Sequence, residues 1–190
     1  VEGVIEAFFR PPPSQQAGFR QIAAMVSNRE FRKQNALIIG GSRGLGEVIT
    51  KVLAAGGANI MMTYAVGRDD ATRVSAEIGK ERNTPDICLY NVLEGSLCEE
   101  MIHFCASVTH IYYLASPTIL KGDSNRWDRL LFTRYCDFYI DGLATLLQQV
   151  RRYGFGNRDL QLFIPSSVFL EQRIKGFDEY IAAKAAAEAY

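Results

Sequence analysis

The sequence predicts a doubly wound α/β fold, in which a parallel β-sheet lies between two layers of helices. From Ala36 onward, short apolar runs alternate with longer helical stretches, which is typical of a chain of βα units. The runs are apolar throughout, as expected for strands that are buried on both faces. A glycine-rich turn follows the first run directly and opens a helix. A three-layer αβα domain accounts for all three observations.

The strands and helices can be assigned in chain order. Apolar residues at helical spacing, such as Leu45, Val48, Ile49 and Val52, indicate the helices. Right-handed crossovers between βα units place ligands at the carboxyl ends of the strands, where the strand order reverses. The predicted strands cover residues 36–39, 59–63, 86–90, 110–114 and 160–164. The predicted helices cover residues 45–55, 70–80, 97–108 and 125–153, and a further helix begins at about residue 177. The stretch 125–153 is long enough to contain a bend or break.

The first 35 residues differ in pattern from the rest of the chain. Pro11-Pro12-Pro13 and Ser14-Gln15-Gln16 interrupt two short amphipathic stretches there. We therefore predict a leader or interdomain linker over residues 1–35, followed by one domain over residues 36–190.

Charge and composition exclude several classes of partner. The 190 residues contain 21 Lys and Arg against 21 Asp and Glu, so no net field draws in nucleic acid or an anionic membrane surface. No apolar run approaches the roughly 20 residues that span a bilayer. Four cysteines without a C-x-x-C pair and two histidines predict no metal site, and reduced thiols in apolar runs favour a cytoplasmic protein. A small-molecule enzyme fits these limits best.

The glycine-rich turn is Gly40-Gly41-Ser42-Arg43-Gly44-Leu45-Gly46. A pyrophosphate group needs backbone that approaches it closely, adopts unusual dihedral angles and points amide groups at it from a helix amino terminus. Glycine permits all three. A plain tight turn is the alternative, but the strand before the turn and the helix after it favour a dinucleotide site.

Charge around this turn predicts which dinucleotide is bound. An acid at the end of the second strand would bind a free ribose hydroxyl and repel a 2′-phosphate. The strand instead ends at Tyr64, with Arg68 shortly after it, and Arg43 lies within the turn. Two guanidinium groups can bind a phosphate, so we expect NADPH/NADP+ rather than NADH, although Arg68 can equally be an ordinary solvated arginine.

A tyrosine and a lysine near the end of the chain predict a catalytic helix. Tyr180 and Lys184 are four residues apart, which places the phenol and the ammonium on one helix face. Such a pair also arises by chance, but this pair follows the glycine turn by a full set of βα units. Ser167 supplies a hydroxyl just after the fifth predicted strand, and the neighbouring Ser166 is more readily explained as a cap of that strand or turn.

Taken together, these motifs resemble the short-chain dehydrogenase/reductase family from Ala36 to the end of the chain. The family's G-x-x-x-G-x-G is matched by Gly40, Gly44 and Gly46, and its serine and Y-x-x-x-K by Ser167, Tyr180 and Lys184. The resemblance implies a Rossmann-type fold and the reduction of a ketone to a secondary alcohol by hydride transfer from NADPH. Further cofactor contacts implied by the resemblance fall on Ser42, Leu45, Tyr64, Asn91, Val92 and Ala115.

The resemblance also implies the role of each catalytic residue. Tyr180 would protonate the carbonyl oxygen as negative charge develops there, because hydride adds to the carbonyl carbon. Lys184 would favour the phenolate of Tyr180 and bind the nicotinamide ribose, and it counts among the cofactor contacts. Ser167 would hold the substrate oxygen. The glycine turn is similar to that of ketoreductases that act on 3-oxoacyl thioesters linked to a carrier or to CoA.

Several positions depart from the family pattern. Ile39 stands in place of the usual threonine, Asn91 in place of an aspartate, and Tyr113-Leu114-Ala115-Ser116 in place of N-N-A-G. Tyr139 occupies the place of the asparagine that supports a proton-relay water, and it either takes over the relay or is a core aromatic residue.

The end of the chain and the assembly state complete these expectations. The chain ends shortly after Tyr180, so we expect the carboxyl-terminal strands to be missing and this chain alone to be a poor catalyst. A homodimer, a homotetramer or a part of a larger polypeptide is expected. The alternatives to a ketoreductase are a reductase of sugars or small ketones, and a catalytically weak dinucleotide-binding module of a multidomain protein.

Overall fold

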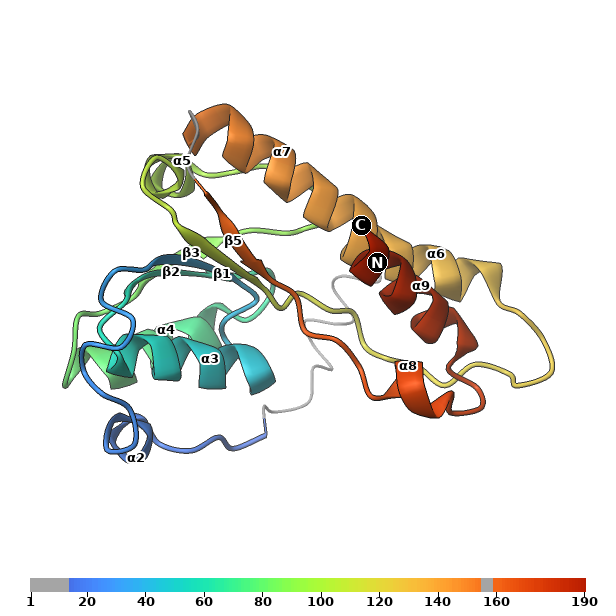
Figure 1. The fold of residues 1–190 in the computed structure, drawn as a ribbon, viewed down its shortest axis with the longest axis horizontal. Helices are drawn as coiled ribbons and strands as arrows, with labels where there is room; N and C mark the ends of the chain where they lie inside the picture. The colour runs from blue at the N-terminus through green and yellow to red at the C-terminus, as the bar shows by residue number, and fades with distance from the viewer. Residues whose placement is uncertain (1–13, 155–158) are drawn as a thin grey trace.

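The computed structural model describes residues 14–154 and 159–190, and the predicted leader residues 1–13 lie outside this part. The chain alternates between strands and helices as predicted (Figure 1). The elements in order are α2 (Phe19–Ala23), β1 (Asn35–Ile39), α3 (Gly44–Ala55), β2 (Asn59–Tyr64), α4 (Arg68–Gly79), β3 (Asp86–Leu89), α5 (Glu99–Cys105), β4 (His110–Tyr113), α6 (Arg129–Cys136), the π-helical turn η1 (Asp137–Asp141), α7 (Gly142–Gly154), β5 (Gln161–Phe163), α8 (Phe169–Gln172) and α9 (Asp178–Ala189).

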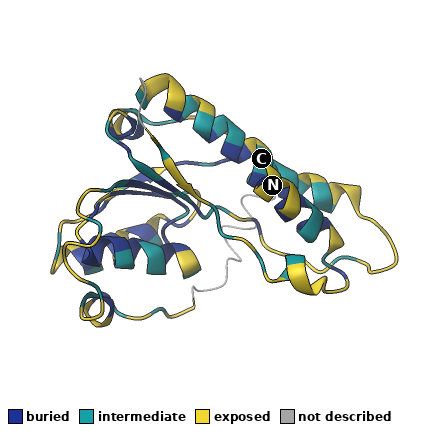
Figure 2. Cartoon of the chain, in the orientation of Figure 1, coloured by how far each residue is buried: buried dark blue, intermediate teal, exposed yellow. Residues whose placement is uncertain are grey.

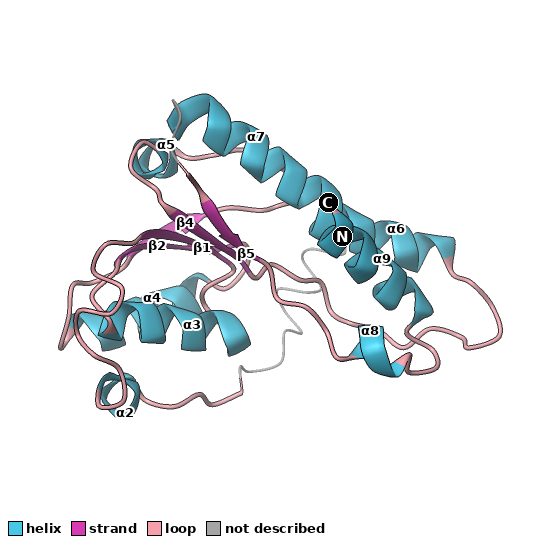
Figure 3. Ribbon diagram, in the orientation of Figure 1, coloured by secondary structure: helices cyan, strands magenta, loops and turns pink. Residues whose placement is uncertain are grey.

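The five strands form one parallel sheet in the order β3-β2-β1-β4-β5. Ala36 of the central strand β1 pairs with Ile60 of β2 on one side and with His110 of β4 on the other. Helices α3 and α4 cover one face of the sheet, and α5 and α7 cover the other (Figures 1 and 3). The predicted doubly wound fold is therefore confirmed, and the strand order reverses between β1 and β4.

Two apolar cores lie on the two faces of the sheet. Because successive strand side chains point to opposite faces, Ile38 packs into the core beneath α3 and α4 while Leu37 and Ile39 pack into the core beneath α5 and α7. Figure 2 shows the central strands as buried. The two edge strands depart from the predicted burial on both faces. Leu89 of β3 is 57% exposed, and Leu162 and Phe163 of β5 are 38% and 44% exposed.

The long helical stretch predicted over residues 125–153 is present from Arg129 to Gly154, so it begins later than predicted. The helix begins at Arg129, where the Asp128 carboxylate accepts hydrogen bonds from the amides of Leu130 and Leu131 at 2.9 and 3.1 Å. It then changes to the π-helical turn η1 before α7 begins. The short helix α8 was not predicted, and α5 covers only the middle of its predicted range. Among the described residues, no helix has both the length and the apolar character needed to cross a membrane.

The described part of the predicted leader packs against α3. Phe19 and Ile22 of α2 are buried in the same core as the side chains of α3 and α4. Beneath α2, the almost fully buried ammonium of Lys51 contacts the carboxylates of Glu47 and Glu77 at 2.8 and 2.9 Å and donates to the Ala17 carbonyl oxygen at 3.0 Å. Residues 17–22 therefore pack against the domain. The domain boundary at residue 36 stays a prediction.

This ionic cluster predicts a pH dependence of stability. Burial raises the pKa of Glu47, but hydrogen bonds from Arg73 and Lys51 outweigh it, so that the pKa lies below its ordinary value of 4.5. A carboxyl group whose pKa is lowered by folding stabilises the fold above its unfolded pKa and loses that contribution as the pH falls. We therefore expect the free energy of unfolding to fall as the pH drops below about 4.5.

Lys51→Met tests this cluster. Removing one partner of a buried ion pair leaves the other uncompensated, so the variant should lose about 3 kcal/mol of stability at pH 7 and show a weaker loss toward acid pH. Lys80→Met, at an exposed lysine, is the matched control. Urea unfolding of the three proteins between pH 3 and pH 7 measures both effects, and parallel curves for Lys51→Met and Lys80→Met would contradict the expectation.

Candidate active site

The glycine turn lies between β1 and α3, and its conformation requires glycine at particular positions. Gly40 has φ +80°, and a Cβ atom there would lie 3.2 Å from the Ala115 amide nitrogen, beyond β4. At Gly46, inside α3, a Cβ atom would lie only 2.1 Å from the Gly40 carbonyl oxygen. Gly44 has φ +50° and opens onto free space at the start of α3. The turn is thus packed against β4 and α3, with room beside Gly44 for an anionic ligand at the helix amino terminus.

Neighbouring strands hold the turn in place. The Gly40 amide donates to the Thr63 hydroxyl oxygen, and the Gly41 amide donates to the Thr63 carbonyl oxygen, both at 3.2 Å. Thr63 lies near the end of β2 and is fully buried. The carboxyl ends of β1, β2 and β4 therefore meet at the turn, which is where a doubly wound sheet binds ligands.

The predicted cofactor residues fall into two groups around this turn. Ser42 is buried within the turn, Leu45 is exposed on the first turn of α3, Tyr64 ends β2 and Arg68 begins α4. At the end of β3, the Asn91 amide group donates to the Glu94 carboxylate at 2.8 Å, and Val92 is buried. All of these residues lie in loops or element ends on the carboxyl side of the strands.

The structure adds an acid that the sequence argument missed. The Arg43 guanidinium contacts the Asp70 carboxylate, with Nε 2.5 Å from Oδ2. The expected preference for NADPH depends on the lack of an acid at the end of β2, whereas Asp70 lies in the first turn of α4 and contacts the glycine turn through Arg43. The signal was present in the sequence as the Asp69-Asp70 pair just after Arg68. The positive charge expected from Arg43 is therefore partly balanced.

Tyr180, on α9, packs within a cluster of aromatic rings. It is 6% exposed, and its ring meets those of Tyr135, Tyr139 and Phe169 edge to face, with centroids 5.6, 6.0 and 5.9 Å away. The rings come from α6, η1 and α8, so three neighbouring elements fix the position of the phenol.

Lys184 lies one helical turn after Tyr180 and is 4% exposed. Its ammonium donates to the Pro165 carbonyl oxygen, just after β5, and lies over the ring of Tyr139 at 4.8 Å from the centroid. Burial lowers the pKa of Lys184, and the negative charge of Glu188 opposes this effect. The predicted tyrosine and lysine are therefore both buried on one face of α9, at the carboxyl edge of the sheet.

Ser167 has a local partner in the structure. Its hydroxyl oxygen accepts a hydrogen bond from the Phe169 amide at 3.3 Å, next to α8, whereas the hydroxyl of the exposed Ser166 donates to the Glu188 carboxylate. The capping contact that we expected for Ser166 is thus made by Ser167. A hydroxyl that accepts this bond can still donate its own proton to another oxygen.

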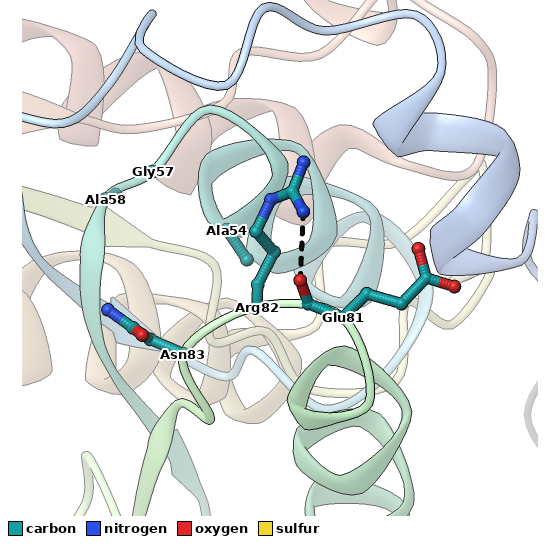
Figure 4. Close-up of a pocket in the computed structure, with 6 residues that line it drawn as sticks. All are labelled: Ala54, Gly57, Ala58, Glu81, Arg82 and Asn83. Carbon is teal, nitrogen blue, oxygen red and sulfur yellow. Dashed lines mark hydrogen bonds between the residues drawn. The ribbon is translucent and has the colours of Figure 1, made fainter.

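Neither of two cavities among the described residues is lined by a predicted site residue. A cavity of about 240 Å³ is lined by residues at the end of α3, the start of β2 and the loop after α4, where the Arg82 guanidinium donates to the Glu81 carbonyl oxygen at 2.9 Å (Figure 4). It therefore lies at the amino-terminal edge of the strands, opposite the glycine turn. No cluster of potential metal ligands is found in residues 14–154 and 159–190.

The fold and the glycine turn define a Rossmann-type α/β domain, and comparison with known proteins narrows the class. No family model matches the sequence. The 3-oxoacyl-acyl-carrier-protein reductase FabG of Staphylococcus epidermidis is 26% identical over 161 residues, which cover 80% of this chain and 64% of that protein. The chain thus spans less than two thirds of the length of this relative.

Solved structures agree with the sequence comparison. FolM alternative dihydrofolate reductase 1 from Brucella canis, complexed with NADP, superposes with a TM-score of 0.71 at 16% identity, covering 84% of this chain and 66% of that chain. A short-chain dehydrogenase from Burkholderia cenocepacia in complex with NADP gives a TM-score of 0.68 at 20% identity, covering 83% and 65%. The chain has the fold of the short-chain dehydrogenases/reductases, and the resemblance predicted from its motifs is confirmed.

Proposed function

We propose that this chain is the nucleotide-binding and catalytic part of an NADPH-dependent oxidoreductase that reduces a ketone to a secondary alcohol. The observation that carries the proposal is the burial of Tyr180 and Lys184 on one face of α9, with the Lys184 ammonium bonded to the end of β5. NADP in the related Brucella and Burkholderia structures supports the choice of cofactor. The likeness to the Staphylococcus reductase favours a 3-oxoacyl thioester, linked to a carrier or to CoA, as the substrate.

The residues of the site can divide the reaction between them. Bound NADPH would supply the hydride that adds to the carbonyl carbon. Tyr180 donates its phenolic proton to the carbonyl oxygen as negative charge develops there, and the neighbouring Lys184 cation favours the phenolate that this transfer leaves. Ser167 donates a hydrogen bond to the same oxygen. The glycine turn holds the pyrophosphate on the backbone amides at the start of α3.

Arg43 and Asp70 together set the cofactor preference in this proposal. In this proposal Arg43 binds the 2′-phosphate, and the Asp70 carboxylate, which contacts Arg43, repels it. Since a hydrogen bond to a charged group contributes about 1.5–3 kcal/mol, Arg43→Ala should weaken NADPH binding about tenfold or more and leave NADH binding nearly unchanged. Asp70→Asn should strengthen NADPH binding.

Fluorescence titration of the reduced nicotinamide measures both effects. Arg82→Ala, at the opposite edge of the sheet, is the control for a lost surface cation and should bind both cofactors like the unmodified protein. Equal losses of NADPH and NADH affinity in Arg43→Ala would show that Arg43 does not bind the 2′-phosphate.

Turnover tests the proposed reaction. The purified natural protein at its full length is mixed with NADPH and a panel of ketones that includes an acetoacetyl thioester, simple ketones and sugars, and oxidation of NADPH is followed by its absorbance. Oxidation that depends on the ketone supports a reductase, and the preferred ketone identifies its class. Tight NADPH binding without turnover on any ketone would instead favour a dinucleotide-binding module of a larger protein. The capping contact of Ser167 and the tight packing of Tyr180 are the observations that favour this second function.

A further inference from the structure

Tyr139 lies between the two predicted catalytic side chains. Tyr139 is 5% exposed, and the Lys184 ammonium lies over one face of its ring, 4.8 Å from the ring centroid. Its edge-to-face contact with the Tyr180 ring spans 6.0 Å between centroids. The same ring therefore contacts the cation and the phenol of the site.

The far end of the Tyr139 ring is bonded to the loop that follows β4. Its hydroxyl shares a hydrogen bond of 2.6 Å with the hydroxyl of Ser116, shortly after β4. Burial raises the pKa of Tyr139 to about 12, so the phenol is neutral at ordinary pH. The ring is thus held at both ends: by its own backbone and by Ser116.

The π-helical turn fixes the backbone from which the ring projects. Tyr139 is the middle residue of η1, and the Tyr113 hydroxyl of β4 donates to the Phe138 carbonyl oxygen at 2.5 Å. Close packing of Gly142 against the same hydroxyl fixes the next turn, because a Cβ atom there would lie 2.8 Å from the Tyr113 oxygen. Single π-helical turns inside α-helices are frequent at functional sites.

The buried ammonium of Lys184 needs more than one partner. An ammonium group has three N–H donors, and burial without compensation disfavours the charged form. The Pro165 carbonyl oxygen accepts one hydrogen bond, and Glu188, one turn further along α9, contributes a negative charge. The face of an aromatic ring attracts a cation at this distance, and it does so more strongly when water is excluded.

We propose that Tyr139 is a positioning residue that holds the Lys184 ammonium beside Tyr180 through the face of its ring, with Ser116 fixing the ring. The consequence for catalysis rests on the proposed function, whereas the placement of the lysine is independent of it. Tyr139 thus combines a core position with a role at the site, and its hydroxyl acts on the ring rather than on the substrate.

Nuclear magnetic resonance tests the placement without any turnover. A ring face under the ammonium shifts the ε-methylene protons of Lys184 to high field, and this is read in protein labelled with ¹³C-lysine, with Lys184→Arg identifying the signal. The shift should be present in the unmodified protein and in Tyr139→Phe, and absent in Tyr139→Leu. Phe169→Leu is the matched control, because it removes a different ring that packs against Tyr180 and should keep the shift. An ordinary Lys184 signal in the unmodified protein overturns the proposal, whether or not the variants fold.

Enzyme kinetics test the proposed effect of Tyr139 on catalysis. Tyr139→Phe keeps the ring and should lower kcat less than threefold, whereas Tyr139→Leu should lower kcat about tenfold or more and also raise the KM for NADPH. The kcat of Ser116→Ala should lie between the kcat values of Tyr139→Phe and Tyr139→Leu. Equal kcat values for Tyr139→Leu and the unmodified protein would overturn the role in catalysis. A high-field Lys184 signal in a protein that reduces no ketone would support the placement and count against the proposed function.

Discussion

In the full-length enzyme, Tyr180→Phe should lower the rate of ketone reduction by about 10²- to 10⁴-fold and leave the dissociation constant for NADPH largely unchanged, because the change removes a proton donor and nothing else. The phenyl ring keeps its contacts with Tyr135, Tyr139 and Phe169, so the aromatic cluster and the position of α9 are retained. The glycine turn is untouched. The loss should therefore appear in kcat and not in cofactor binding.

The matched control for Tyr180→Phe is Tyr135→Phe. The Tyr135 hydroxyl bonds the amide and carbonyl groups of Leu120 at 2.9 and 3.2 Å, in the loop before α6, and its ring belongs to the same cluster. Removing this hydroxyl should cost some stability and little activity. Stopped-flow rates with NADPH and a saturating ketone compare the two variants. A Tyr180→Phe protein with unmodified turnover would show that another group protonates the carbonyl oxygen.

Gly46→Ala is the second change with a large expected effect. The added Cβ atom would lie 2.1 Å from the Gly40 carbonyl oxygen and 3.0 Å from the Gly41 Cα atom, both on the turn itself. Backbone cannot swing away as a flexible side chain does, so the turn or the start of α3 must move. We expect a loss of about 2–3 kcal/mol of stability and NADPH binding too weak to measure.

Gly44→Asn controls for the general effect of losing a glycine in this turn. Gly44 has φ +50°, which asparagine tolerates better than other residues, and a Cβ atom there meets nothing within 4 Å. Thermal unfolding without cofactor should therefore separate the two variants, with Gly46→Ala unfolding at the lower temperature. Identical melting temperatures for both variants and the unmodified protein would refute the tight packing of the turn against α3.

The central part of the fold could be predicted because its signals are local in the sequence. An apolar run followed directly by Gly40 and Gly41 identifies β1, the turn and the start of α3 without knowledge of any distant contact. The spacing of Tyr180 and Lys184 likewise needs only the geometry of one helix. These predictions depend only on patterns within short stretches of sequence, even though the folded residues also contact distant parts of the chain.

Features that depend on distant contacts could not be predicted. The π-helical turn interrupts an otherwise helical pattern at a point where the Tyr113 hydroxyl of β4 bonds the Phe138 carbonyl oxygen. The acidic pair after Arg68 is visible in the sequence, but the contact of Asp70 with Arg43 depends on α3 and α4 lying side by side. The docking of α2 depends on the buried Lys51, whose position within an amphipathic helix gives no sign of burial.

The dissociation constants of NADPH and NADH for the unmodified protein test the central claim most directly. Isothermal titration calorimetry gives both values and requires neither a known substrate nor turnover. The account predicts that NADPH binds about tenfold or more tightly, since the 2′-phosphate gains a charged hydrogen bond from Arg43. Equal dissociation constants, or no binding of either cofactor by the folded protein, would contradict it.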